Sequence, residues 1–124
     1  MKNLKEFPYA DLIGLEIQSA NTGKCTCSIA FKKILLNPNN VIHGGAIYSL
    51  ADTGMGAALA STLEDGELCA TIEIKMMYLK PAGHFDLFCH TEVIKKGRRV
   101  ALLESEVFSN NELIAKASGS FAIF

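Results

Sequence analysis

The sequence predicts an α+β protein in which a curved antiparallel sheet of five to six strands wraps around one long central helix. One long stretch in the middle is apolar nearly all round, as a buried helix is, while most other segments alternate apolar and polar residues. Short turns join most of those segments, as in antiparallel hairpins. The 124 residues are 49% hydrophobic, and we expect them to form a single domain, 1–124.

The part of the chain before the apolar stretch predicts a hairpin. Residues 12–18 and 24–31 have strand patterns, and "ANTG" between them supplies Gly23 for the turn. Residues 1–11 are expected to form a short helix or an arm. The segment "LLNPNN" ends the strand pattern, because Pro38 fixes its own φ and asparagines favour turns.

The apolar stretch predicts a mostly buried helix over residues 45–63. Its few polar side chains fall on one side by the i, i+3, i+4 rule; they are Tyr48, Ser49, Asp52 and Thr53. The helix is expected to stop before the turn "EDGE".

Alternation then predicts strands over 68–78, 85–93 and 113–123, with a less regular one over 100–108. In the first of these, the even-numbered residues from Leu68 to Tyr78 are expected to share one face. The connections "KPAGH", "KKGR" and "SNNE" predict hairpins, so that the sheet would continue after the helix as a meander.

Charge and composition exclude several classes of function. The formal net charge is −1 and the basic residues are scattered except at 95–99, which argues against a nucleic-acid partner. No signal peptide and no run of 18 apolar residues is present, so we expect a cytoplasmic protein without a membrane partner.

The cysteines at positions 25, 27, 69 and 89 form no C-x-x-C pair. No metal site is therefore indicated. Cys25 and Cys27 share a strand face with Ile29 and Phe31, which makes them small core residues, and free thiols agree with a reducing compartment.

The start of the helix offers a site for an oxyanion. The first N–H groups of a helix lack internal partners and carry partial positive charge, and at Gly44 and Gly45 no side chain blocks approach. Asp52 lies about 12 Å further along the axis and about 80° round it. If Gly44 and Asp52 serve one reaction, the site must be shared across a two-fold dimer interface.

Acyl transfer to water fits these groups. An N–H polarises a thioester or ester carbonyl, while the carboxylate either activates a water or attacks directly to give an anhydride. The alternative is that Asp52 merely faces solvent and that Gly44-Gly45 is only a loop, although an unpaired carboxylate is costly to bury. His43 is expected to orient groups through hydrogen bonds and not to act as a base.

The stretch "NPNNVIHGGAIYSLAD" has an asparagine six residues before His43 and an aspartate nine after it. It resembles the hotdog-fold acyl-CoA thioesterases of the 4-hydroxybenzoyl-CoA thioesterase superfamily, in particular the phenylacetic-acid-degradation branch. The segments "IEIKMMYLKPAG" and "VIKKGRRVALLESEVF" also resemble that family, so most of the chain is covered. The resemblance implies a hotdog fold and hydrolysis of an acyl-CoA.

The resemblance also implies roles for individual residues. Asp52 matches the catalytic carboxylate, and Gly44 matches the residue whose N–H polarises the thioester carbonyl. Asn37 and His43 match positions that hold water or the carbonyl in place, and Thr71 matches a Ser or Thr near the attacking water. Such proteins are dimers, commonly paired into homotetramers, and they need no metal or other cofactor, since coenzyme A is part of the substrate.

The basic turn "KKGRR" allows two interpretations. It is the solvated tip of a hairpin, or its residues bind the phosphates of coenzyme A together with Lys80 and with Gly45 at the helix start. The basic residues concerned are Lys95, Lys96, Arg98 and Arg99.

Two other functions compete with hydrolysis. A chain that kept the fold without turnover would be a non-catalytic acyl-CoA binder. A hotdog dehydratase is disfavoured, because its histidine lies in a longer Pro-Gly loop, whereas His43 directly precedes two glycines.

Overall fold

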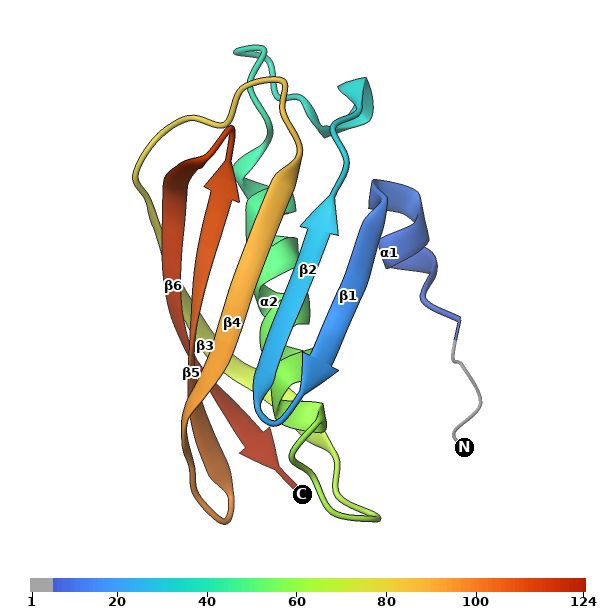
Figure 1. Cartoon of the computed structure of the whole chain (residues 1–124), viewed down its shortest axis with the longest axis vertical. Helices are drawn as coiled ribbons and strands as arrows, with labels where there is room; N and C mark the ends of the chain where they lie inside the picture. The colour runs from blue at the N-terminus through green and yellow to red at the C-terminus, as the bar shows by residue number, and fades with distance from the viewer. Residues whose placement is uncertain (1–5) are drawn as a thin grey trace.

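A computed structural model of the chain describes residues 6–124 (Figure 1). It contains six strands, two α-helices and one 3-10 turn. In chain order these are α1 (Pro8–Ile13), β1 (Leu15–Asn21), β2 (Lys24–Ile29), η1 (Lys33–Leu35), α2 (Gly44–Ala60), β3 (Cys69–Tyr78), β4 (Leu87–Lys96), β5 (Val100–Ser109) and β6 (Glu112–Ile123).

The six strands form one antiparallel sheet in the order β1-β2-β4-β5-β6-β3. The sheet curves around α2, which lies against its concave side (Figure 1). The sequence prediction of a curved antiparallel sheet around one long helix is confirmed, with six strands. The short helix expected near the N-terminus is α1, while residues 1–5 of that prediction lie outside the described part.

The predicted hairpin between β3 and β4 is wrong. The strand β3 lies at the edge of the sheet beside β6, and β4 pairs with β2 and β5. Residues 79–86 instead cross over the segment that precedes α2, where the Ile42 N–H donates to the Ala82 carbonyl at 3.0 Å and Ala82 is buried. Only β4, β5 and β6 form the expected meander.

The first hairpin is confirmed, with shifted ends. Thr22 and Gly23 have φ values of 52° and 78° and form a two-residue turn of the type that suits twisted strands. The strand β1 starts at Leu15, later than residue 12, because Leu12 belongs to α1 and Gly14 ends that helix with a left-handed φ of 75°.

The strand β3 does not keep one face toward the helix. Its pairing with β6 shifts between Thr71 and Glu73, and an extra residue at such a bulge reverses the alternation. Ile72 is therefore 56% exposed, while Ile74 beyond the bulge packs against the core. The prediction of a single face from Leu68 to Tyr78 is wrong, and Thr71 faces α2 instead of Ile72.

The helix α2 runs from Gly44 to Ala60, one residue earlier at its start and three shorter at its end than predicted. Its apolar side chains fill the core; the largest that are fully buried are Leu50, Met55 and Leu59. Its predicted polar side is confirmed, since Tyr48 is exposed and Ser49, Asp52 and Thr53 are half-buried.

Three cysteines lie where the helix meets the sheet. Cys25, Cys27 and Cys89 are buried free thiols, as expected for small core residues. Contact with the other two sulfurs, together with burial, raises the pKa of Cys27 far above its usual range, so this group stays a neutral thiol.

Helix and sheet approach each other closely at Gly54. A Cβ there would lie 2.8 Å from Thr91 Oγ1 and 3.2 Å from Cys27 Sγ. Thr91 Oγ1 is held by Ser105 Oγ at 2.6 Å, so the neighbour has little room to move. Gly54 therefore sets how deeply α2 sits in the sheet.

We predict that Gly54→Ala destabilises the protein while Gly56→Ala, in the same helix, does not. A Cβ at Gly56 meets nothing closer than 3.8 Å. Both variants gain about 1 kcal/mol of helix propensity, but overpacking at Gly54 costs about 1–3 kcal/mol. Urea unfolding at one protein concentration should give Gly56→Ala a higher free energy of unfolding than Gly54→Ala. Equal free energies of unfolding for the two variants would contradict the tight contact.

Candidate functional site

The start of α2 is built by His43, Gly44 and Gly45. His43 is the N-cap, and its Nδ1 accepts the Gly45 N–H at 2.7 Å. The imidazole folds so closely over Gly45 that a Cβ there would lie 2.9 Å from Nδ1. The second glycine is thus needed for the cap, and the expectation that His43 orients groups by hydrogen bonding is consistent with this geometry.

Gly44 is needed for a different contact. The Tyr78 hydroxyl donates to the Gly44 carbonyl at 2.8 Å, and a Cβ at Gly44 would lie 3.2 Å from the Tyr78 ring. Within residues 6–124 the Gly44 N–H has no hydrogen-bond acceptor. Gly44 lines a hollow of about 290 Å³ that Tyr78 and Lys80 also line. An available donor with partial positive charge therefore lies at this end of the helix.

Asp52 lies on the half-buried side of α2. The Thr71 hydroxyl donates to Asp52 Oδ1 at 2.7 Å, which places the sequence-predicted pair in direct contact. The two side chains border a hollow of about 400 Å³ whose other walls are largely apolar and include Phe7, Ile17 and Phe121. The hydrogen bond orients the carboxylate toward a space in which an apolar group would fit.

Asn37 shapes the loop before the helix. Its Oδ1 accepts the N–H groups of Asn39 at 2.9 Å and Val41 at 3.4 Å, an Asx turn that reverses the chain. The amide NH2 has no partner within the described part of the chain. Asn37 therefore positions the segment that leads to His43, and only its NH2 end is free to meet a ligand.

The two halves of the predicted site do not meet in one chain. The hollow beside Gly44 and the hollow beside Asp52 share no lining residue. About 12 Å of one straight helix separates them, as its geometry requires.

The predicted basic residues are also divided between the two ends of α2. Lys80 lines the hollow at the helix start and pairs with Glu112. The turn 96–100 lies at the opposite end, near the end of α2 (Figure 1). A single chain does not gather these cations around one phosphate.

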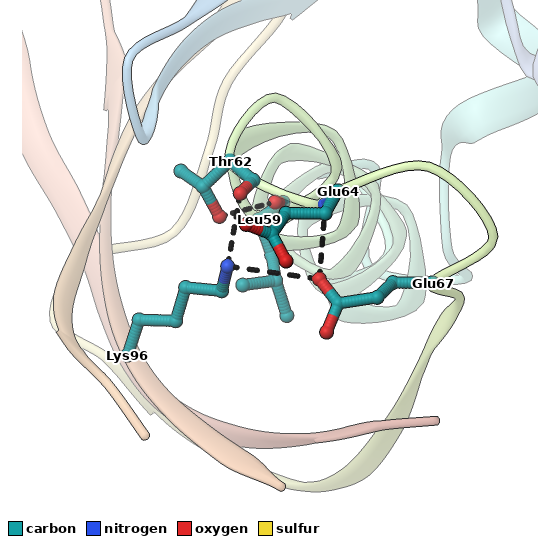
Figure 2. A network of polar contacts seen from close by, with 5 residues as sticks. All are labelled: Leu59, Thr62, Glu64, Glu67 and Lys96. Carbon is teal, nitrogen blue, oxygen red and sulfur yellow. Dashed lines mark hydrogen bonds and ion pairs between the residues drawn. The ribbon is translucent and has the colours of Figure 1, made fainter. Parts of the chain in front are cut away.

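Lys96 has a structural partner at that far end. Its Nζ donates to the Thr62 carbonyl at 2.9 Å and lies 3.8 Å from a Glu67 carboxylate oxygen, which in turn accepts the Glu64 N–H (Figure 2). A cation near unpaired carbonyls at a helix end is stabilising. The side chains of Lys95, Arg98 and Arg99 make no hydrogen bond or ion pair to residues 6–124 and remain available to a ligand.

Tyr78 was missed by the sequence analysis. It ends an edge strand, and nothing in the alternation pattern distinguishes it from any other apolar residue there. Burial, with a smaller effect of the nearby Tyr48, raises its pKa, so the hydroxyl stays protonated and donates to Gly44.

Comparison with known proteins identifies the family. The model of the thioesterase superfamily matches residues 39–116, which include both halves of the site. The chain belongs to the thioesterase superfamily. Membership in it makes the protein a hydrolase and agrees with the resemblance found in the sequence.

Individual relatives extend the match over nearly the whole chain. A candidate esterase of Archaeoglobus fulgidus is 36% identical over 121 residues, which cover 96% of this chain and 75% of the relative. A conserved protein of Pseudomonas aeruginosa has a solved structure with a TM-score of 0.91, 32% identity and coverage of 96% of this chain and 95% of that one.

A protein from the phenylacetic acid degradation operon of E. coli has the same fold. Its TM-score is 0.86 at 22% identity, with coverage of 94% of this chain and 83% of that one. This thioesterase-superfamily chain therefore has the hotdog fold that the resemblance implied.

Residues 6–124 give no sign of a membrane-spanning helix or of a metal-binding cluster. No helix among them is long and apolar enough to cross a bilayer. They also contain no group of three or more His, Cys, Asp and Glu side chains placed to hold a metal ion.

We predict that Lys96→Ala lowers stability by about 1 kcal/mol, because it leaves the Thr62 carbonyl at the helix end without its cation. Lys95→Ala, one residue away, is the matched control and should unfold like the wild type. Chemical denaturation compares the two. If Lys96→Ala instead left stability intact and weakened binding of coenzyme A, the phosphate-binding interpretation of this lysine would replace the structural one.

Proposed function

We propose that the protein hydrolyses an acyl-CoA to a carboxylic acid and free coenzyme A. The observation that carries this proposal is the Asp52 carboxylate, held by Thr71 at 2.7 Å beside an apolar hollow, on the same helix as the unpaired Gly44 N–H. The functional unit we propose is the single domain 1–124.

The proposed reaction uses these groups as follows. The Gly44 N–H donates to the thioester carbonyl oxygen and stabilises the negative charge that develops there. Asp52 takes a proton from a water that adds to the carbonyl carbon, or its carboxylate adds directly to give a mixed anhydride that water then opens. The C–S bond breaks, the coenzyme A thiolate leaves and is protonated, and no cofactor or metal is needed.

A shared site would reunite the two halves. The strand β3 is an edge of the sheet, with Thr71 near its start and Tyr78 at its end. If two copies pair antiparallel along this edge about a two-fold axis between Ile74 and Lys75, Thr71 of one lies opposite Tyr78 of the other, because the axis exchanges the two ends of the strand. Asp52 of one chain would then approach the Gly44 N–H of its partner.

Exposed apolar side chains support this pairing. Along the edge they are Tyr48, Ile72, Met77 and Tyr78, which are 36–56% exposed. An uncovered edge strand with such a surface is a ready template for another chain. We propose a homodimer as the minimal active unit, with two dimers forming a homotetramer through the outer face, where Phe88, Ile94 and Leu102 are exposed.

The location proposed for this enzyme is the cytoplasm. Its four cysteines carry free thiols, which is consistent with a reducing compartment.

The phosphates of coenzyme A are expected to bind to basic side chains from opposite ends of α2, which the proposed dimer would bring together; they are Lys95, Arg98, Arg99 and Lys80.

We predict that Asp52→Asn lowers the rate of coenzyme A release by at least 100-fold, since the amide is neither a base nor a nucleophile. Thr71→Ala keeps the carboxylate but removes the hydroxyl that holds it, so this variant should lower the rate of coenzyme A release about 10-fold. Thiol release is followed for aryl-, short- and long-chain acyl-CoAs, and release of the carboxylic acid is followed for oxygen esters, because relatives are candidate esterases. Equal rates for wild type and Asp52→Asn would refute the mechanism.

We predict that Gly44→Pro abolishes most activity while Gly44→Ala keeps far more. Gly44 is the first helical residue, where proline is accepted, and the ψ of 134° at His43 suits a following proline. Both variants place a Cβ against Tyr78, but only proline removes the N–H. Loss of an oxyanion donor lowers kcat by a factor of about 10²–10³.

Mixing the two inactive chains tests whether the site is shared. Co-expressed Asp52→Asn and Gly44→Pro chains should regain about a quarter of wild-type activity, because half of the dimers are mixed and each has one intact site. A site within one chain would regain nothing. Light scattering that showed only monomers would also contradict the shared site.

A further inference from the structure

One peptide group links Tyr78 to His43. The Tyr78 hydroxyl donates to the Gly44 carbonyl at 2.8 Å, and the N–H of the same amide, that of Gly45, donates to His43 Nδ1 at 2.7 Å. The tyrosine and the imidazole are therefore joined through a single amide, although they lie 35 residues apart in the sequence.

This link decides which imidazole nitrogen carries the proton. A backbone N–H can only donate, so Nδ1 of His43 must be the unprotonated nitrogen, and the neutral ring carries its proton on Nε2. The His43 side chain is exposed, and its Nε2 has no partner in residues 6–124. His43 thus presents an N–H donor at the helix start, and its basic nitrogen is already occupied.

Tyr78 strengthens and fixes this arrangement. A donor on the carbonyl oxygen polarises the amide and makes its N–H a better donor to Nδ1. The Tyr78 ring also lies against Gly44, where even a methyl group would be 3.2 Å from it, and so hinders rotation of the peptide. This contact adds to the hydrogen bonding of the helix itself, which alone leaves the amide more freedom to tilt away from the imidazole.

We propose that Tyr78 is a positioning residue that holds the Gly44-Gly45 peptide so that His43 presents Nε2–H as a second donor, beside the Gly44 N–H, to the substrate carbonyl oxygen. The contact between this Nε2–H and the substrate carbonyl oxygen rests on the proposed thioester hydrolysis. The proton position on His43 does not depend on it, because it follows from hydrogen bonds of the free protein.

The first test measures the tautomer of the neutral His43 ring by long-range 1H–15N correlation in the substrate-free protein. The wild type should show the proton on Nε2. Tyr78→Phe should raise the fraction of His43 rings with the proton on Nδ1 about fivefold, which corresponds to the net free energy of one hydrogen bond. Tyr48→Phe is the matched control, since its hydroxyl also donates to a backbone carbonyl, that of Ile74, at 3.3 Å. It should match the wild type.

A second variant covers the case in which Tyr78→Phe does not fold. Gly45→Ala places a Cβ 2.9 Å from Nδ1 and displaces the ring while Tyr78 stays in place, so it should produce the same tautomer change. A His43 tautomer ratio unchanged in whichever of the two variants folds would overturn the proposal.

The second test separates positioning from overall folding. Tyr78→Phe should lower kcat for acyl-CoA about five- to tenfold with KM unchanged, because the donor acts mainly on the charged transition state. If Tyr78→Phe raised KM without lowering kcat, or if Tyr48→Phe lowered kcat equally, the proposed effect of Tyr78 on catalysis would be overturned. Absence of wild-type turnover on every thioester would refute the proposed function, while the tautomer measurement would still decide the role of Tyr78.

Discussion

One rigid helix imposes the main constraint on this protein. Gly44 and Asp52 lie about 12 Å apart along the axis of α2, because eight residues of one continuous helix separate them. The two groups open on separate hollows as a result. The shared site and the dimer proposed for this chain follow from that separation.

The edge strand β3 supplies what each half of the site needs. Near its start, Thr71 holds the carboxylate of Asp52; at its end, Tyr78 holds the peptide that follows Gly44. The bulge between these two residues turns Thr71 toward the helix, while Tyr78 keeps the same orientation beyond it. A strand without the bulge would direct one of these hydroxyl groups to the outer face of the sheet.

The His43-Gly44-Gly45 segment shows why small residues gather at a helix start. Each glycine is required by a different neighbour: Tyr78 lies over the first, and the capping imidazole lies over the second. As the first residue of the helix, Gly44 also has an N–H without an acceptor in the described chain. Close packing of neighbours and an open backbone donor are therefore two results of one local geometry.

Local sequence patterns determined much of this protein. Alternation and apolar composition predicted the helix, all the strands and the Thr22-Gly23 turn, because these depend on short-range periodicity and backbone preference. The His43, Gly44 and Asp52 spacing also predicted that the two ends of the site lie apart, since helix geometry alone sets that distance.

Only the tertiary structure decided the rest. The predicted strand order is wrong because "KPAGH" alone looks like a short hairpin loop. The full connection, 79–86, instead packs over the segment that precedes α2, a contact that no local signal encodes. The bulge in β3 and the bond from Tyr78 to Gly44 depend on partners 34 or more residues away. Lys96 likewise looked like its basic neighbours until the fold placed it against the end of α2. Periodicity specifies elements, but side-chain partners depend on how those elements pack.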